Sequence, residues 1–254
     1  TVALAGGTQL LADKRRSFDS AQDVRAAVDL SALGLAYIRE RDGMVVIGAT
    51  TTLAAIAESP ILRALANGVL AQAAHRSASS ILRNQATIAG ALIAEPDGVL
   101  AVALLALDAR VMMVGKETRT VAASEVLKEL RELEGTALVT EIAVPLTNPR
   151  ASLQTVARTP SDKPIVCVVA SARIESGIAR VVRIALGGVG EVAMRASAAE
   201  QALEGQMLND AVIENTARAA SQDLSPCGDF RGSAEYRQAM AVVLTRRAVK
   251  ELRA

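Results

Sequence analysis

Short apolar stretches separated by polar turns dominate the first 145 residues. Apolar runs predict strands at 1–5, 44–49, 110–115 and 137–145. Between them, residues 59–75 carry apolar side chains at helical spacing, with Ser59 suited to the N-cap and Pro60 to the first helical position. A proline halts the last strand and "LTNPR" follows as a linker, so a domain boundary is predicted near residue 148.

The pattern changes after this linker. Three strands are predicted in succession, at 152–158, 165–175 and 179–189, with a turn at Ser176-Gly177 between the last two. Three helices are predicted next, at 197–204, 210–220 and 233–254. The first opens with "SAAE", a predicted capping box of Ser197 and Glu200. Strands followed by segregated helices indicate an α+β fold rather than a doubly wound α/β domain, with a three-stranded antiparallel sheet and three helices in this part.

Composition restricts the possible partners. The apolar fraction is 51% but only 2% of the 254 residues are aromatic, so stacking platforms for single-stranded nucleic acid are missing. The net charge of +1, without a basic block, indicates no polyanionic partner. With no 18-residue uncharged apolar span, no signal peptide and little cysteine, we expect no membrane insertion and a cytoplasmic location. Because the chain begins within a strand, we also expect that an N-terminal segment is missing.

Familiar catalytic patterns are absent. Two cysteines sixty residues apart and one histidine do not support a zinc site or an iron–sulfur cluster, and Cys167 lies in an apolar run as a buried thiol. The spacing G-x-G-x-x-A occurs at 188–193, but the next helix is expected only at Ser197, which argues against a dinucleotide-binding fold. No phosphate-binding P-loop is present. A Ser-His-Asp triad would need His75, which lies at a helix end as an ordinary surface cation.

Two paired-small-residue turns remain, each flanked by threonine. Gly6-Gly7 precedes Thr8, and Ala89-Gly90 follows Thr87. Small residues expose consecutive backbone N–H groups and let the chain approach a ligand closely, which builds an anion-binding nest without lysine. Two such turns suit the two phosphates of a diphosphate, gripped from opposite sides in a large cofactor.

These segments resemble a known family. "AGGTQLL" and "ILRNQATIAGALI" are similar to the two flavin loops of the FAD-binding medium subunit of molybdenum hydroxylases, the carbon monoxide dehydrogenase and xanthine dehydrogenase group. The resemblance covers nearly the whole chain. The other segments that follow the family's order and spacing are 28–33, 47–56, 104–109, 139–145, 183–190 and 229–248.

The resemblance implies an architecture and a cofactor site. Residues 1–148 would form a two-subdomain FAD-binding fold of the PCMH type, with a boundary near residue 48, and residues 149–254 a C-terminal domain of the carbon monoxide dehydrogenase flavoprotein type. FAD would be held noncovalently between the subdomains. Carried over by position, the cofactor-binding residues are Ala5, Gly6, Gly7, Thr8, Gln9, Thr87, Ile88, Ala89, Gly90 and Ala91, with Asp97, Ile165 and Leu186 as looser assignments.

It also implies a function in electron transfer. The chain would be the flavoprotein subunit of an oxidoreductase, passing electrons from an iron–sulfur small subunit, fed by a molybdenum-cofactor large subunit, through FAD to an external acceptor. No catalytic side chain is then required, because the flavin carries the redox chemistry.

Two alternatives stay open. The first is a structural subunit with a decayed flavin site, because Ala89 and Ala91 replace a glycine and a polar residue of the family and the loop "EPDGVL" is one residue short. The second is a stand-alone flavin oxidoreductase.

Overall fold

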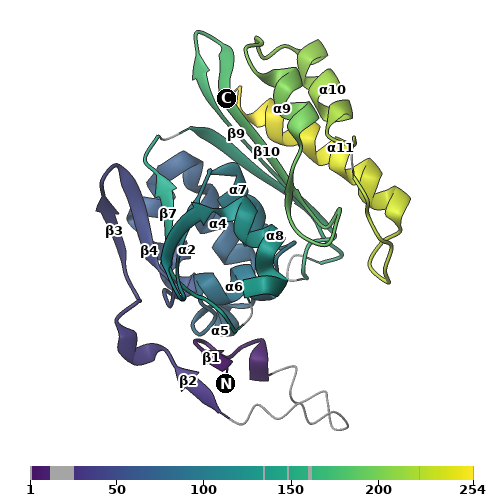
Figure 1. Ribbon diagram of the computed structural model, residues 1–254. Helices are drawn as coiled ribbons and strands as arrows, with labels where there is room; N and C mark the ends of the chain where they lie inside the picture. The colour runs from purple at the N-terminus through teal and green to yellow at the C-terminus, as the bar shows by residue number, and fades with distance from the viewer. Residues whose placement is uncertain are drawn as a thin grey trace.

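The computed structural model describes residues 2–11, 26–133, 135–147, 149–159, 162–222 and 224–253. Thr1 of the first predicted strand and Asn148 of the predicted linker therefore lie outside the described residues. Within the described residues the chain forms three sheets with helices packed against two of them, and the expected α+β class is confirmed (Figure 1).

The smallest sheet lies at the N-terminal end. Strand β1 (Val2–Leu4) pairs in parallel with β2 (Ala27–Asp29), and the short helix η1 (Ser31–Leu33) follows. In Figure 1 this purple unit lies next to helix α5 (Ser80–Arg83). The position of β1 fixes where the first glycine loop, which starts at Ala5, meets the rest of the molecule.

The second sheet is antiparallel, in the order β3-β4-β7-β5-β6. Its central strands consist largely of buried Val and Ile, which suit a sheet with a covered face. Helix α7 lies in the core, and every one of its residues is buried, as expected for a helix that is apolar all round. The elements of this part are β3 (Ile38–Arg41), β4 (Met44–Gly48), α2 (Leu53–Glu58), α3 (Pro60–Ala64), η2 (Leu65–Gly68), α4 (Val69–Arg76), α6 (Ile88–Ala94), α7 (Val99–Ala106), β5 (Arg110–Val114), β6 (Thr118–Ala122), α8 (Ala123–Leu133) and β7 (Leu138–Pro145).

The helix predicted over 59–75 is broken. Ser59 caps it as expected, accepting a hydrogen bond from the Leu62 N–H at 3.4 Å. However, Ala66 and Asn67 have positive φ angles of 49° and 56°, so α3 ends and α4 starts a new helix. The apolar spacing continues through this break because α3 and α4 both bury their apolar side chains in one core. The sequence pattern therefore did not reveal the break.

The third sheet has the order β11-β10-β9-β8 and is antiparallel. The three predicted strands are present, and the two-residue strand β11 is an addition. Ser176 and Gly177 both have positive φ, as a two-residue type I′ hairpin turn requires, so the predicted turn is confirmed. The elements of this part are β8 (Arg150–Val156), β9 (Val166–Glu175), β10 (Ile178–Gly187), β11 (Met194–Arg195), α9 (Ser197–Leu203), α10 (Asp210–Ala219) and α11 (Ala234–Glu251).

Helices cover both faces of this third sheet. Helix α11 runs along β8 and β9 on one face, while α4 and α7 of the preceding part pack on the other (Figure 1). Side chains of β9 alternate accordingly: Val166 and Val168 join the core under α11, whereas Cys167 and Val169 join the core around α7. Burial on both faces explains why the first five residues of this strand, 166–170, are all apolar.

The predicted capping box is wrong. Ala196 is the N-cap of α9 and makes no side-chain cap bond. The Glu200 carboxylate instead accepts hydrogen bonds from the Ile184 N–H at 2.9 Å and from Nε of Arg195 at 2.8 Å. Glu200 is buried, and tying β10 and β11 to α9 satisfies its charge better than a bond to its own helix terminus.

The structure also bears on the catalytic and binding motifs considered in the sequence. Residues 188–193 form bends and no helix, which agrees with the argument against a dinucleotide-binding fold. Cys167 is a free, buried thiol whose pKa burial raises to about 12, and His75 is exposed in the last turn of α4. No single helix within the described ranges is long and apolar enough to cross a membrane, and no group of metal-ligating side chains was found among the same residues.

Candidate cofactor site

A cavity of about 700 Å³ lies where the first glycine loop meets helix α6. This volume is within the range of small-molecule and cofactor sites. The walls come from the first loop, the start of α5, one side of α6 and the start of β7, so segments from both predicted subdomains contribute. The lining includes residues 3–10, Thr50, Ser79, Leu82, Thr87, Ala89, Gly90, Ala91, Ile93, Ala94, Glu95, Gly98, Leu138 and Val139.

Gly6 makes the closest approach between the two sides of this cavity. A Cβ atom placed on Gly6 would lie 1.8 Å from the carbonyl oxygen of Gln85, far inside van der Waals contact. Gln85 stands two residues before Thr87, so the missing side chain lets the first loop rest directly on the backbone that leads into α6. The two small-residue segments that are eighty residues apart are therefore neighbours.

The first loop presents free backbone donors. Gly7 has a φ of +68°, which turns the chain after β1. Within the part of the chain that the structure describes, the N–H groups of Gly6, Gly7 and Thr8 have no hydrogen-bond acceptor. Three consecutive unpaired donors beside a cavity are the donor set that an anion-binding nest uses, and anion binding by this loop stays a prediction.

The second segment has a different structure from the predicted turn. Thr87 is the N-cap of α6, with its Oγ1 accepting from the Gly90 N–H at 3.3 Å and its carbonyl accepting from the Ala91 N–H at 2.8 Å. Ala89 and Gly90 are thus in the first turn of a helix, where a methyl group at Ala89 causes no strain because φ is negative.

The remaining donors of this helix terminus are also occupied. Ile88 N–H donates to the carbonyl of Thr51 at 3.0 Å, and Ala89 N–H donates to the carbonyl of Ala49 at 3.2 Å. These bonds attach α6 to the end of β4. The prediction of a second nest with free N–H groups is therefore wrong, and the polar group that this segment offers to the cavity is the Thr87 hydroxyl.

Most of the predicted site residues line the cavity. All five residues of the first loop do so, and Thr87, Ala89, Gly90 and Ala91 do so on the opposite side. Ile88 does not, because its side chain is fully buried in the core.

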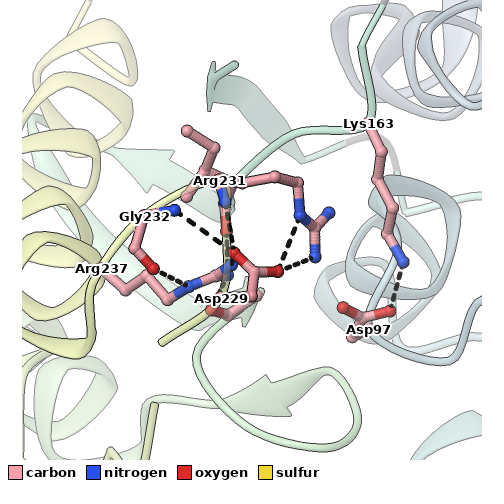
Figure 2. A network of polar contacts seen from close by, with 8 residues as sticks. Asp97, Lys163, Asp229, Arg231, Gly232 and Arg237 are labelled. Atoms are coloured by element: carbon pink, nitrogen blue, oxygen red, sulfur yellow. Dashed lines mark hydrogen bonds and ion pairs between the residues drawn. The ribbon is translucent and has the colours of Figure 1, made fainter. Parts of the chain in front are cut away.

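Asp97 also lies outside the lining. Its carboxylate pairs with the Lys163 ammonium at 2.9 Å, as Figure 2 shows, and its carbonyl oxygen lies against Gly187. Because Lys163 comes from the segment before β9, this ion pair links the loop after α6 to the third sheet. Asp97 joins two parts of the chain instead of facing the cavity.

Ile165 and Leu186 are placed in the core below α11, away from the cavity lining. The carbonyl of Ile165 accepts a hydrogen bond from the buried Arg237 guanidinium at 2.7 Å. Arg237 also binds Asp229, which holds Arg231 as well (Figure 2). Desolvation would raise the pKa of the Asp229 carboxyl, but the hydrogen bonds from Arg231 and Arg237 hold it well below its usual range. This region is a structural polar network, and the geometry gives no support to a cofactor contact by either apolar residue.

Other lining residues were missed by sequence reasoning. Ser79 at the N-cap of α5, Leu138 and Val139 at the start of β7, and Glu95 with Gly98 after α6 all border the cavity. Leu138 and Val139 carry no local signal, because their role depends on how β7 docks. Glu95 is the one ionisable residue in the described lining of the cavity. In the sequence it is only a single acid that follows an apolar stretch.

The described lining is suited to binding an anionic cofactor. The first loop, whose N–H groups have no acceptor among the described residues, lines the cavity together with Thr87, and apolar residues of α6 and β7 form much of the wall. A diphosphate fits such donors, and the apolar wall suits the flat rings of a flavin dinucleotide. The donor set therefore fits FAD, which would supply the redox chemistry when bound.

Comparisons with known proteins identify the family of this chain. Residues 1–147 match the FAD binding domain in molybdopterin dehydrogenase, and residues 151–252 match the CO dehydrogenase flavoprotein C-terminal domain. The glyceraldehyde dehydrogenase medium chain of Sulfolobus acidocaldarius is 28% identical over 99% of this chain and 90% of its own length. The carbon monoxide dehydrogenase medium chain of Hydrogenophaga pseudoflava is 29% identical over 97% of this chain and 87% of its own.

Solved structures give the same result. The carbon monoxide dehydrogenase of Hydrogenophaga pseudoflava that lacks the Mo-pyranopterin moiety of its cofactor superimposes with a TM-score of 0.87 and 30% identity, over 97% of this chain and 87% of that chain. Quinoline 2-oxidoreductase of Pseudomonas putida 86, at 24% identity, shares the fold with a TM-score of 0.88 over 99% and 89% of the two chains. The chain belongs to the family of FAD-binding medium subunits of molybdenum hydroxylase-type dehydrogenases.

Proposed function

We propose that this subunit binds FAD in the cavity between the Gly6-Gly7 loop and α6, and that it carries electrons from iron–sulfur clusters of a partner subunit through FAD to an external acceptor. The observation that carries the assignment of the site is the nest of free N–H groups that Gly6 brings against the backbone before α6. The partners would be an iron–sulfur small subunit and a molybdenum-cofactor large subunit. Relatives named as medium chains of dehydrogenases support this assembly.

In this function the protein supplies position and not acid–base catalysis. The first loop would hold the diphosphate, and the Thr87 hydroxyl would approach it from the α6 side. Apolar wall residues such as Leu138 and Val139 would exclude water from one side of the bound cofactor. Chemistry of this kind requires no catalytic side chain, because the flavin would carry the redox step.

An absorption spectrum of the purified protein between about 300 and 550 nm tests the binding function, followed by identification of the molecule that heat releases. We expect oxidised-flavin bands and released FAD. A colourless protein that stays colourless with added FAD would favour the structural subunit with a decayed site. Oxidase or reductase activity of the isolated chain with a small donor would favour the stand-alone enzyme instead. Transfer of electrons from a reduced iron–sulfur partner to the bound flavin tests the electron path.

A further inference from the structure

Glu95 is a carboxylate inside a cavity proposed for an anionic cofactor. It follows α6 directly and lines the cavity together with Gly98. Its Oε2 atom lies over that glycine, since a Cβ placed on Gly98 would be 3.2 Å from it. The Glu95 side chain is half-buried and has no hydrogen-bond partner among the described residues.

The cations near Glu95 are engaged elsewhere. Lys163 pairs with Asp97 at 2.9 Å, and Arg231 pairs with Asp229 at 2.6 Å (Figure 2). Asp97 adds a second negative charge on the same loop as Glu95. Helix α7 brings no ionisable group to this end, and the lining residues of β7 are apolar. The local environment therefore offers Glu95 little compensation for its charge.

Burial accordingly raises the pKa of Glu95, and the neighbouring Asp97 raises it further, while Lys163 and Arg231 act in the opposite direction. A dinucleotide diphosphate carries two negative charges at neutral pH. Placing it in the same poorly screened cavity disfavours the ionised carboxylate still more.

We propose that Glu95 borders the bound FAD and that the cofactor binds with uptake of one proton by this carboxylate. The proton comes from solvent, and the neutral carboxylic acid then has an O–H group that can donate to the cofactor. This inference rests on the proposed function, because it takes the cavity to be the FAD site. It assigns a pH-dependent affinity to this particular chain.

The sign of the effect follows from linkage. If bound FAD raises the pKa of Glu95, the affinity is highest below the pKa of the free protein and falls as pH rises toward the pKa of the complex. Within that window the dissociation constant increases by up to about tenfold per pH unit, the limit for a single proton. Glu95→Gln, which is neutral at every pH, removes this dependence and binds FAD more tightly than the native chain at high pH.

The experiment is calorimetric titration of the cofactor-free full chain with FAD between about pH 5 and pH 8, in two buffers of different ionisation enthalpy. The difference in apparent enthalpy gives the number of protons taken up. Asp97→Asn is the matched control, because it removes a carboxylate two residues away that does not line the cavity. In Asp97→Asn we expect proton uptake on FAD binding to persist but to occur at lower pH, because the Asp97 charge contributes to the raised pKa of Glu95.

The outcomes separate the two proposals. Proton uptake in the native chain and in Asp97→Asn, with none in Glu95→Gln, supports the inference. Tight FAD binding with the same affinity at every pH, or uptake that survives in Glu95→Gln, overturns it while leaving the binding function intact. A native chain that binds no FAD at any pH overturns both.

Discussion

The two small-residue segments look alike in the sequence and differ in the structure. The first, at Gly6-Gly7, is a loop that lines the cavity and whose N–H groups have no acceptor among the described residues. The second, at Ala89-Gly90, is the capped start of α6, and its N–H groups are already bonded to protein oxygens. Binding of a diphosphate should therefore depend mainly on the first loop, with the second segment contributing its shape and the Thr87 hydroxyl.

The largest effect is expected at Gly6. In Gly6→Ala the new methyl group would collide with the Gln85 carbonyl, and the loop must move away from α6. Such overpacking typically costs roughly 1–3 kcal/mol, which corresponds to about 5- to 150-fold weaker binding. The measurement is the dissociation constant for FAD by titration of the cofactor-free protein.

Gly190→Ala is the control for that substitution. Its added Cβ would have no neighbour closer than 3.6 Å, and its φ is not positive. Flavin content should stay at the native level. If Gly6→Ala binds FAD as well as Gly190→Ala does, the first loop is not the diphosphate site.

A smaller effect is expected at Thr87. Thr87→Val removes the cap of α6 and the hydroxyl that faces the cavity, so stability falls by about 1 kcal/mol and FAD binds about fivefold more weakly. Thr52→Val is a matched control, because Thr52 caps α2 through the Ala55 N–H but does not line the cavity.

Thermal unfolding and FAD titration of both variants separate the two roles of the hydroxyl. Both should lose similar stability, and only Thr87→Val should lose affinity. Equal loss of affinity in the two would mean that capping, not contact with the cofactor, explains the effect.

Ala91 tests the possibility of a decayed site. Ala91 lines the cavity, and its methyl group offers no hydrogen-bond donor. Ala91→Ser adds a hydroxyl and should tighten FAD binding by roughly 1 kcal/mol, about fivefold. Ala91→Val, which adds bulk without a donor, should not. Unchanged affinity in Ala91→Ser would show that the cofactor lies out of reach of this position.

Sequence reasoning was reliable where local pattern determines structure. Continuous Val and Ile predicted β4, β7, β9 and β10, and Ser176-Gly177 supplied the two positive φ angles of a hairpin turn. Pattern also indicated a turn at the first loop, because glycine permits the positive φ of Gly7 and the close backbone approach of Gly6 that the structure shows there.

The errors have physical causes that the sequence does not display. Helix α6 is apolar or small at every position, so no periodicity distinguishes it from a strand and turn, and its start is fixed by distant carbonyls of Ala49 and Thr51. Ile165 and Leu186 belong to a different core because the third sheet is covered on both faces. Which side chains of that sheet enter each core depends on the packing of α7 and α11, which no local pattern encodes.

The smallest expected effect is on the stability of the cofactor-free protein, which the ionised Glu95 carboxylate after α6 lowers. Because folding raises its pKa, the ionised carboxylate is less favourable in the folded than in the unfolded chain. Stability of the native chain should therefore fall as pH rises from the ordinary value of a glutamate toward the raised value. Glu95→Gln escapes this loss, so its unfolding temperature should equal that of the native chain at low pH and exceed it at pH 8.

Asp97→Asn should instead lower the unfolding temperature at pH 8. It breaks an ion pair with Lys163 that stabilises the fold by about 0–1 kcal/mol at this exposure. Asp97 thus stabilises the fold by joining this loop to the third sheet, whereas Glu95, two residues earlier, destabilises it. A carboxylate that costs stability in the cofactor-free protein does not serve the fold, and its place beside the proposed cofactor fits the pH-dependent affinity proposed above. If Glu95→Gln lowers the unfolding temperature at pH 8 as Asp97→Asn does, Glu95 serves the fold and this distinction is lost.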